Sequence, residues 1–287
     1  MAIDFTKWQG CGNDFVLIED MDERVADASK LAARICDRHF GIGADGLILL
    51  LPSDSADLKM RIFNADGSEA EMCGNGIRCF SRLAYERGIV TRGEFSVETG
   101  AGILRPRIVK ERDAIVGVCV DMGEPRLLSR EIPAVDFVGI GENDRVVGAQ
   151  MKVDGAGFRV TCVSMGNPHC VVFIAENGYD DIMSFPIERF GPLFERDAHF
   201  PRKTNTEFVK VIDRSHLRMR VWERGAAVTL ACGTGACATL VAASLNDLAD
   251  KKADIGLDGG TLHVEWKGDN HVYMTGPAEK VFEGRFE

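Results

Sequence analysis

The sequence repeats itself, and a duplicated chain is expected to fold as two copies of one unit. The segment Met60–Asn64 aligns with Met219–Glu223, and Cys73–Gly76 aligns with Cys232–Gly235 at the same separation along the chain. Two further pairs keep the same order at nearly the same separation: Gly12–Asn13 with Gly166–Asn167, and His39–Phe40 with His199–Phe200. Chance matches would scatter, so we interpret the chain as two homologous halves, which we expect a pseudo-twofold axis to relate.

The length of 287 residues suits two domains of ordinary size. We predict a first domain over residues 1–122 and a second over residues 123–274. The C-terminal segment 275–287 is expected to pack back on the first domain. No low-complexity tract or long linker interrupts the sequence.

Short runs rich in Val, Ile and Phe, separated by Gly, Pro, Asn and Asp, predict β-strands in both halves. One helix per half is predicted directly after Cys73 and after Cys232. The first is amphipathic and ends near Gly88, whereas the second is apolar nearly all round and must therefore be surrounded. The predicted fold class is α/β, of the α+β type: two homologous, pseudo-symmetric domains, each a curved, mostly antiparallel sheet around a central helix. The predicted strands cover residues 15–19, 47–51, 59–63, 93–98, 114–121, 158–164, 170–174, 207–212, 216–222 and 260–266.

Charge and cysteine content exclude several classes of function. Lys and Arg number 34 against 44 Asp and Glu, and the net charge of −10 disfavours binding to nucleic acid or an anionic membrane. No secretion signal is recognisable, and the uncharged stretch Ala226–Leu245 is too rich in Gly and Thr for a membrane helix. Nine cysteines without a C-x-x-C pair predict free thiols in a reducing cytoplasm and no metal site.

The pair of Cys-Gly-x-Gly motifs is the strongest candidate site. Cys73 and Cys232 each come directly before a predicted helix, where free backbone N–H groups and the helix dipole favour anions. That position is expected to lower the pKa of a thiol. A single such cysteine could equally be a buried structural thiol, but two at symmetric positions favour function. The other cysteines are interpreted as core residues: Cys11, Cys36, Cys79, Cys119, Cys162, Cys170 and Cys237.

Residues 41–46 match the G-x-G-x-x-G pattern of dinucleotide sites. Such a site requires a strand before the motif and a helix after it. Here the order is reversed, because a helix-like stretch precedes and the strand at residues 47–51 follows. We therefore reject a nucleotide-binding role for this segment and expect no organic cofactor.

Several polar residues stand in loops or at strand ends. Each asparagine alone is typical of a turn, but Asn13 and Asn167 are repeat mates. Arg224 could be a surface residue or could grip a carboxylate with two parallel hydrogen bonds. His169 could be a loop histidine or could tune a nearby thiol. The candidates are Asn13, Asn64, Asn167, Asn205, Glu223, Arg224 and His169.

Two thiols that reach one α-carbon from opposite sides could invert its configuration. One thiolate would remove the α-proton while the opposite thiol delivers a proton to the other face, which is general acid–base catalysis at two faces. Helix N-termini would hold the carboxylate and stabilise the developing negative charge. This chemistry demands no organic cofactor.

The motifs together resemble the diaminopimelate epimerase family over the whole chain. The resemblance is carried by residues 12–15, 63–68, 73–80, 164–170, 222–226 and 231–238. It implies cofactor-independent interconversion of LL- and meso-2,6-diaminopimelate in lysine biosynthesis, by an enzyme with two similar domains, often a homodimer.

The resemblance also implies roles for individual residues. Cys73 and Cys232 would be the acid/base pair, and His169 and Glu223 would influence the thiols. The N–H groups of Gly74, Asn75, Gly233 and Thr234 would hold the reacting carboxylate. The remaining contacts with substrate would come from Asn13, Asn64, Asn167, Asn205, Glu223 and Arg224.

Departures and rivals are both visible. The family usually has Leu where Cys11 stands, and Gly-Glu where Ala227–Val228 stands. The nearest rival, a proline or hydroxyproline racemase, usually shows Cys-Gly-His-Gly at its first cysteine, whereas this chain has Asn75. A small-anion binding module with incidental thiols is the non-enzymatic alternative.

Overall fold

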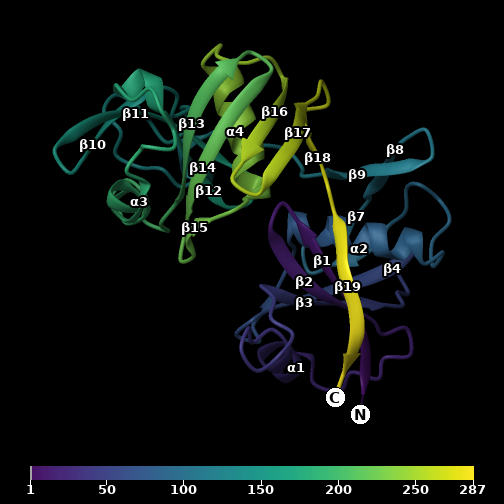
Figure 1. Cartoon of the computed structure of the whole chain (residues 1–287). Helices are drawn as coiled ribbons and strands as arrows, with labels where there is room; N and C mark the ends of the chain where they lie inside the picture. The colour runs from purple at the N-terminus through teal and green to yellow at the C-terminus, as the bar shows by residue number, and fades with distance from the viewer. Residues whose placement is uncertain (1) are drawn as a thin grey trace. The chain divides into compact units, whose positions relative to one another are not determined.

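The computed structural model describes residues 2–287 and divides into two compact units (Figure 1). Unit 1 contains the chain up to Asp121 together with Thr275–Glu287, and unit 2 contains Met122–Met274. Each unit combines a sheet of short strands with few helices.

The sheet of unit 1 has the strand order β19-β1-β2-β3-β4-β6-β7, with β5 paired to β4. Strands β8 and β9 form an antiparallel hairpin in the same unit. The last strand, β19, runs antiparallel to β1, so both ends of the chain meet in one sheet (Figure 1). The strands of this unit are β1 (Ile3–Gly10), β2 (Asn13–Glu19), β3 (Gly46–Leu51), β4 (Leu58–Asn64), β5 (Glu69–Ala70), β6 (Val97–Thr99), β7 (Gly102–Leu104), β8 (Arg107–Glu111), β9 (Ala114–Asp121) and β19 (Glu279–Phe286).

The sheet of unit 2 has the order β10-β11-β12-β13-β14-β16-β17-β18, with β15 paired to β14. Its strands are β10 (Ala149–Val153), β11 (Ala156–Ser164), β12 (Pro168–Phe173), β13 (Asn205–Asp213), β14 (His216–Glu223), β15 (Ala227–Thr229), β16 (Lys252–Leu257), β17 (Gly260–Trp266) and β18 (Val272–Gly276).

The two units share one order of elements and one pairing pattern. The series β1-β2-α1-β3-β4-β5-α2-β6-β7 corresponds to β11-β12-α3-β13-β14-β15-α4-β16-β17. In both series the second strand pairs parallel with the third, the fourth pairs parallel with the sixth, and the other pairs are antiparallel. The prediction of a duplicated, mostly antiparallel fold is confirmed.

Each sheet packs on the helix that follows its cysteine. Helix α2 (Gly74–Glu86) contacts β1 to β4, β8 and β9, and helix α4 (Gly233–Leu245) contacts β11 to β14, β16 and β17 (Figure 1). Every residue of α4 from Gly235 to Ala243 is buried, which confirms that its apolar surface requires enclosure on all sides. Helix α2 ends at the Arg87 C-cap, and Gly88 follows with φ of 69°, as a C-terminal glycine does.

Nine of the ten predicted strands correspond to observed ones, but the strand predicted at 93–98 is present only as β6 at its end, and the sequence did not reveal the whole sheet. Strands β16 and β18 alternate buried with partly buried residues, and β10 and β19 lie at an edge, so their apolar runs are broken. Strand β1 is buried in its middle, but Thr6 and Lys7 break its apolar run. The helix-like stretch expected before residue 41 contains α1 (Ala28–Ile35), which ends earlier than expected, whereas α3 (Ile187–Glu195) was not predicted. Helix α3 holds Pro192 and thus lacks a helical sequence signature.

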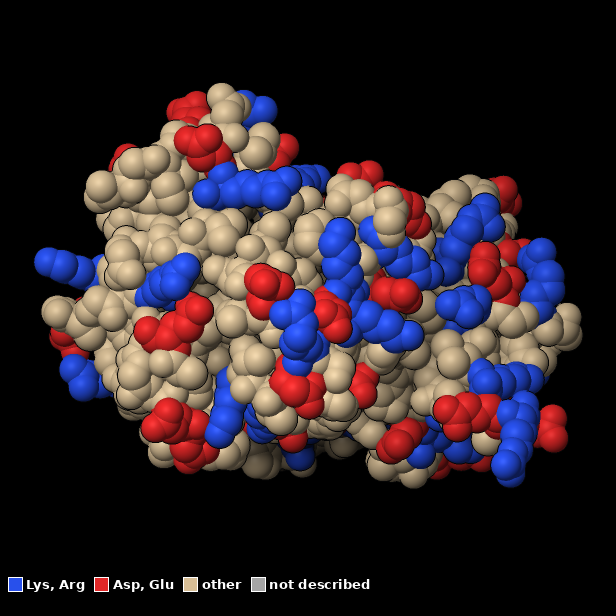
Figure 2. Space-filling view, turned by 90° about the horizontal axis from the view of Figure 1, so that it is seen from above, with Lys and Arg blue, Asp and Glu red and all other residues tan. Residues whose placement is uncertain are grey.

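Charged side chains of both signs lie on the surface. On the face drawn in Figure 2, acidic and basic side chains are interspersed, without a large area of one sign. In the part of the chain that the structure describes, no helix is both long and apolar enough to cross a membrane.

Candidate functional site

Both candidate cysteines occupy the N-cap position of a thirteen-residue helix. Cys73 caps α2 with φ −140° and ψ 121°, and Cys232 caps α4 with φ −124° and ψ 110°. The next residues, Gly74 and Asn75 in α2 and Gly233 and Thr234 in α4, begin a first turn whose N–H groups have no earlier helical carbonyl to bind. Each unit therefore presents a thiol beside a set of backbone donors, which suits an anionic substrate group.

The side chain of Asn13 lies against Cys73 in unit 1. Its Oδ1 is 3.7 Å from the Cys73 Sγ and accepts a hydrogen bond of 3.1 Å from Asn75 Nδ2. Its Nδ2 donates to Asp45 Oδ2 at 2.7 Å. A carboxylate can only accept, so Asp45 fixes the orientation of the amide, and the oxygen of Asn13 must face the thiol.

Asp45 belongs to the segment that matched a dinucleotide motif. Its other oxygen binds Arg38, which also binds Asp14, and Asp14 pairs with the buried Lys7 at 2.7 Å. These opposite charges hold the pKa of Asp14 at about 2: burial works in the opposite direction, but hydrogen bonds from Arg38 and Lys7 outweigh it. The glycine-rich loop therefore positions the carboxylate of Asp45, which orients Asn13. The resemblance to a dinucleotide motif did not predict this role.

Arg78 anchors the first turn of α2 from behind. The side chain is fully buried, and it donates to Gly74 O at 3.0 Å and to Pro277 O at 3.1 Å. Its Nη2 lies 3.8 Å from the Sγ of Cys11, the residue that departs from the family pattern. Burial raises the pKa of Cys11, so this thiol is a neutral neighbour of Arg78.

Unit 2 surrounds Cys232 with a chain of polar side chains. The Sγ lies 3.5 Å from Thr234 Oγ1, which accepts from Asn167 Nδ2 at 3.3 Å. Asn167 Oδ1 lies 3.0 Å from His169 Nε2, and His169 Nδ1 lies 2.7 Å from Glu207 Oε1. The sequence reasoning placed Asn167, His169 and Thr234 near this cysteine but missed Glu207. Strand β13 also contains the charged Lys210 and Asp213, so its sequence did not mark Glu207 as special.

The environment of Cys232 corrects one prediction. Burial raises the pKa of this thiol well above its ordinary value, and the carboxylates of Glu223 and Glu207 raise it further. Thr234 and the Gly235 N–H work in the other direction but do not prevail. The lowered pKa expected from a helix N-terminus is thus wrong for Cys232, because desolvation and two carboxylates outweigh the helix.

Glu223 lies at the end of β14, next to the β14–β15 turn. It accepts a short hydrogen bond from the Thr229 hydroxyl, and burial raises the pKa of its carboxyl. Asn205, at the start of β13, accepts from the Arg224 N–H at 2.9 Å and donates to Pro168 O at 3.1 Å. Asn205 therefore links the backbone at Arg224, next to Glu223, to the backbone at Pro168, next to His169.

The remaining predicted residues are exposed. Arg224 reaches the solvent and donates to Arg202 O at 3.0 Å. Asn64 ends β4 and donates to Ser68 Oγ at 2.9 Å within the β4–β5 turn. Unit 1 thus brings Asn13, Cys73 and Asn75 together, and unit 2 brings Asn167, His169, Glu223, Cys232 and Thr234 together.

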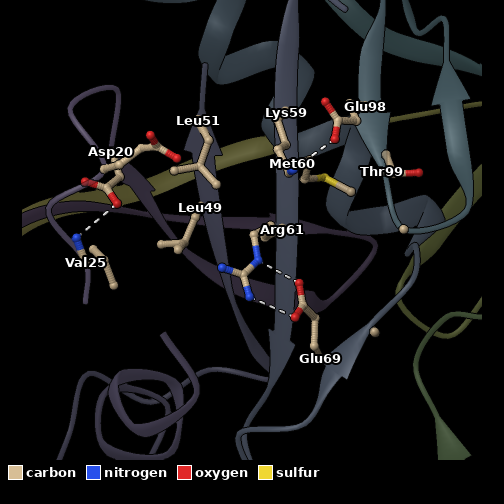
Figure 3. Close-up of a pocket in the computed structure, with 13 residues that line it drawn as sticks. Asp20, Val25, Leu49, Leu51, Lys59, Met60, Arg61, Glu69, Glu98 and Thr99 are labelled. Atoms are coloured by element: carbon tan, nitrogen blue, oxygen red, sulfur yellow. Dashed lines mark hydrogen bonds and ion pairs between the residues drawn. The ribbon is translucent and has the colours of Figure 1, made fainter. Parts of the chain in front are cut away.

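A separate hollow of about 390 Å³ lies on unit 1 (Figure 3). Two ion pairs line it: Arg61 binds Glu69 through two hydrogen bonds of 2.7 and 2.9 Å, and Lys59 pairs with Glu98 at 2.8 Å. None of the predicted site residues lines it, so it has no part in the chemistry argued below.

Residues 5–128 and 161–281 match the family model of diaminopimelate epimerase. The chain belongs to this family. A diaminopimelate epimerase from Moorella thermoacetica is 52% identical over 284 residues, with 98% of each chain covered. One from Methanococcus maripaludis is 48% identical over 284 residues, with 99% of each covered. Membership in this epimerase family makes the chain an isomerase.

More distant solved structures share the fold. A phenazine biosynthesis protein of the PhzF family from Bacillus anthracis has a TM-score of 0.69 at 17% identity, covering 100% of this chain and 99% of its own. A hydroxyproline epimerase from Agrobacterium vitis, with trans-4-hydroxy-L-proline bound, has a TM-score of 0.68 at 13% identity, covering 99% and 92%. At these identities the likeness concerns architecture only.

Proposed function

We propose that this protein interconverts LL- and meso-2,6-diaminopimelate by removing and returning the α-proton, with Cys73 and Cys232 as the acid/base pair. The observation that carries the proposal is the equivalent placement of both cysteines, each the N-cap of the helix that its sheet encloses. Inversion of one α-carbon needs an acid/base group at each of its two faces, and two equivalent cysteines would supply them. The membership of the chain in the diaminopimelate epimerase family supports the choice of substrate.

The reacting carboxylate binds the backbone N–H groups at the two helix starts, from Gly74, Asn75, Gly233 and Thr234. The positive ends of α2 and α4 then stabilise the negative charge that develops as the α-proton leaves. One cysteine is a thiolate and takes the proton, while the other is a thiol and supplies one. Their roles exchange with the direction of the reaction.

The second amino-acid centre of the substrate does not react and must be held. We assign this task to Asn64, Asn167, Asn205, Glu223 and Arg224, with Arg224 gripping the distal carboxylate. His169 and Glu223 tune the thiol of Cys232. Asn13 accepts from Cys73 and contacts substrate when it is bound.

The decisive experiment follows deuterium from D₂O into the α-position. The protein should label LL-diaminopimelate and convert it to the meso form, while proline offered separately stays unlabelled. Single replacement of Cys73→Ala or Cys232→Ala should abolish inversion and leave circular dichroism unchanged. Labelling of proline instead would establish the racemase alternative, and no labelling of either substrate would establish a binding module.

We further propose that the enzyme works as a homodimer in the cytoplasm, in lysine biosynthesis. Nine free thiols suit a reducing compartment. Strand β19 lies at the edge of its sheet with Val281 and Phe282 exposed, and exposed apolar edges are typical of association surfaces. Sedimentation velocity at micromolar concentration should give the mass of two chains, and a single-chain mass would contradict the dimer.

A further inference from the structure

Glu207 and His169 form a buried pair behind the candidate site of unit 2. Both side chains are fully buried, and Oε1 lies 2.7 Å from Nδ1. The other oxygen of Glu207, Oε2, is also buried and has no hydrogen-bond partner among residues 2–287. A lone buried carboxylate would be strongly unfavourable, so its compensation must come from the histidine.

The hydrogen bonds of Asn167 determine whether Nε2 of His169 carries a hydrogen. Asn167 Nδ2 donates to Thr234, so Oδ1 is the atom that faces Nε2. An amide oxygen can only accept, and Nε2 is therefore a donor toward Asn167. Glu207 holds the ring in this position through Nδ1.

The hydrogen on Nε2 of His169 determines which atom donates in each of the following hydrogen bonds. Nε2–H donates to Asn167 Oδ1 at 3.0 Å, which turns Asn167 Nδ2 toward Thr234, 3.3 Å away. Because Thr234 Oγ1 accepts from Asn167, its own hydrogen is directed to the Cys232 Sγ at 3.5 Å. A bare Nε2 would reverse every step and leave Thr234 accepting from the thiol.

We propose that Glu207 is a positioning residue that orients the series His169, Asn167 and Thr234 so that a hydrogen bond from the Thr234 hydroxyl stabilises the Cys232 thiolate when it forms. This inference deepens the proposed function and rests on it. The resting cysteine is a thiol, and the series supplies a donor at the moment when Cys232 acts as base. Glu223, the other carboxylate close to Cys232, opposes the thiolate, so a donor is needed there.

Unit 1 offers a built-in comparison. Asn13, the repeat mate of Asn167, is oriented by Asp45 with its oxygen toward Cys73. An acceptor faces the thiol there, whereas a hydroxyl donor faces the thiol in unit 2. Loss of the Thr234 hydroxyl should therefore weaken the chemistry of Cys232 more than that of Cys73.

The test separates the two cysteines by their half-reactions. A variant with one cysteine can still exchange the α-proton with D₂O, because one base removes and returns it at the same face. We would measure this exchange with both isomers of diaminopimelate in Cys73→Ala, where Cys232 acts, and in Cys232→Ala, where Cys73 acts. Each background then receives Thr234→Val, which keeps the shape, or Thr234→Ser, which keeps the hydroxyl.

In the Cys73→Ala background, Thr234→Val should slow exchange by about tenfold or more, the effect of a lost hydrogen bond to a charged group. Thr234→Ser should restore the rate. In the Cys232→Ala background the same changes can act only through the Thr234 backbone N–H that holds the carboxylate, so any slowing of exchange should be clearly smaller than in the Cys73→Ala background. Equal losses in both backgrounds, or no loss in the first, would overturn the inference. Failure of the proposed function looks different, since the unaltered protein would then label no diaminopimelate.

A second measurement addresses Glu207 itself. Nitrogen-15 spectra of the histidines, with the His169 signals identified through His169→Gln, should show a protonated Nε2 in the unaltered protein. In Glu207→Gln the carboxylate no longer determines this proton, and the signals should move to those of a neutral ring exchanging between tautomers. A bare Nε2 in the unaltered protein, or spectra that Glu207→Gln leaves unchanged, would overturn the role of Glu207.

Discussion

At the scale of single residues, carboxylates set which way the site asparagines face. Asp45 is half-exposed, yet it is the group that fixes Asn13 against Cys73. Asp45→Ala removes the acceptor and frees the amide to rotate, so we expect kcat to fall about tenfold with little change in the melting temperature. Glu69→Ala is the matched control, because it also removes a half-exposed carboxylate paired with an arginine in unit 1. Equal kcat values for both variants would remove Asp45 from the argument.

Arg224 is the residue whose chemistry is least replaceable. Its guanidinium can hold a carboxylate with two parallel hydrogen bonds, which a lysine cannot reproduce at the same charge. We expect Arg224→Lys to lower kcat/KM for LL-diaminopimelate by about tenfold or more, with a loss in kcat as well as a rise in KM, because remote binding orients the reacting centre. Steady-state kinetics in both directions measure this. Kinetics close to those of the unaltered enzyme would take Arg224 out of the site and favour the alternative of a proline or hydroxyproline racemase.

At the scale of elements, the β14–β15 turn carries a strained departure from the family pattern. Ala227 begins β15 with φ of 59°, a region that favours glycine, and glycine is the usual family residue there. We expect Ala227→Gly to raise the free energy of unfolding by about 1 kcal/mol, measured by denaturant titration. The neighbouring Ala226 has no positive φ, so Ala226→Gly should lower stability instead. The same sign for both variants would show that strain at Ala227 is not the cause.

The helices and strands also show which parts of the fold could be predicted from the sequence. Helices α2 and α4 were predictable because each follows a cysteine, begins with the Gly-x-Gly of the repeated motif and is rich in apolar residues. The repeat revealed both halves of the fold because Met60–Arg61 and the Cys-Gly-x-Gly motif recur in the second half at one separation. Strand β19 was not predictable, since nearly all its residues are exposed and its pairing partner β1 lies at the other end of the chain.

The residues of the candidate site also fall into those that the sequence could predict and those that it could not. Cys73, Cys232 and the asparagines could be found from local motifs, because their neighbours in sequence carry the signal. Glu207, Asp45 and Arg78 could not, because their roles depend on hydrogen bonds across long separations, such as Arg78 to Pro277. The pKa of Cys232 was also beyond the sequence, since the depth of burial and two carboxylates decide it.

At the scale of the whole molecule, the chain closes unit 1 with its own last strand. Residues 279–286 pair with β1 along almost its full length, and the carbonyls of Pro277 and Ala278 receive Arg78 and Arg82 of α2. Removing residues 279–287 leaves β1 as an open edge, so its inner ladder to β2 should exchange amide hydrogens much faster. Strands β11 to β14 belong to unit 2 and should keep their protection. Glu283→Ala, which breaks the ion pair with Arg87 but keeps the ladder, is the control and should leave both units protected. Faster exchange throughout both units would show instead that the last strand stabilises the chain as one cooperative body, and unchanged exchange in β1 would show that β19 contributes no stability.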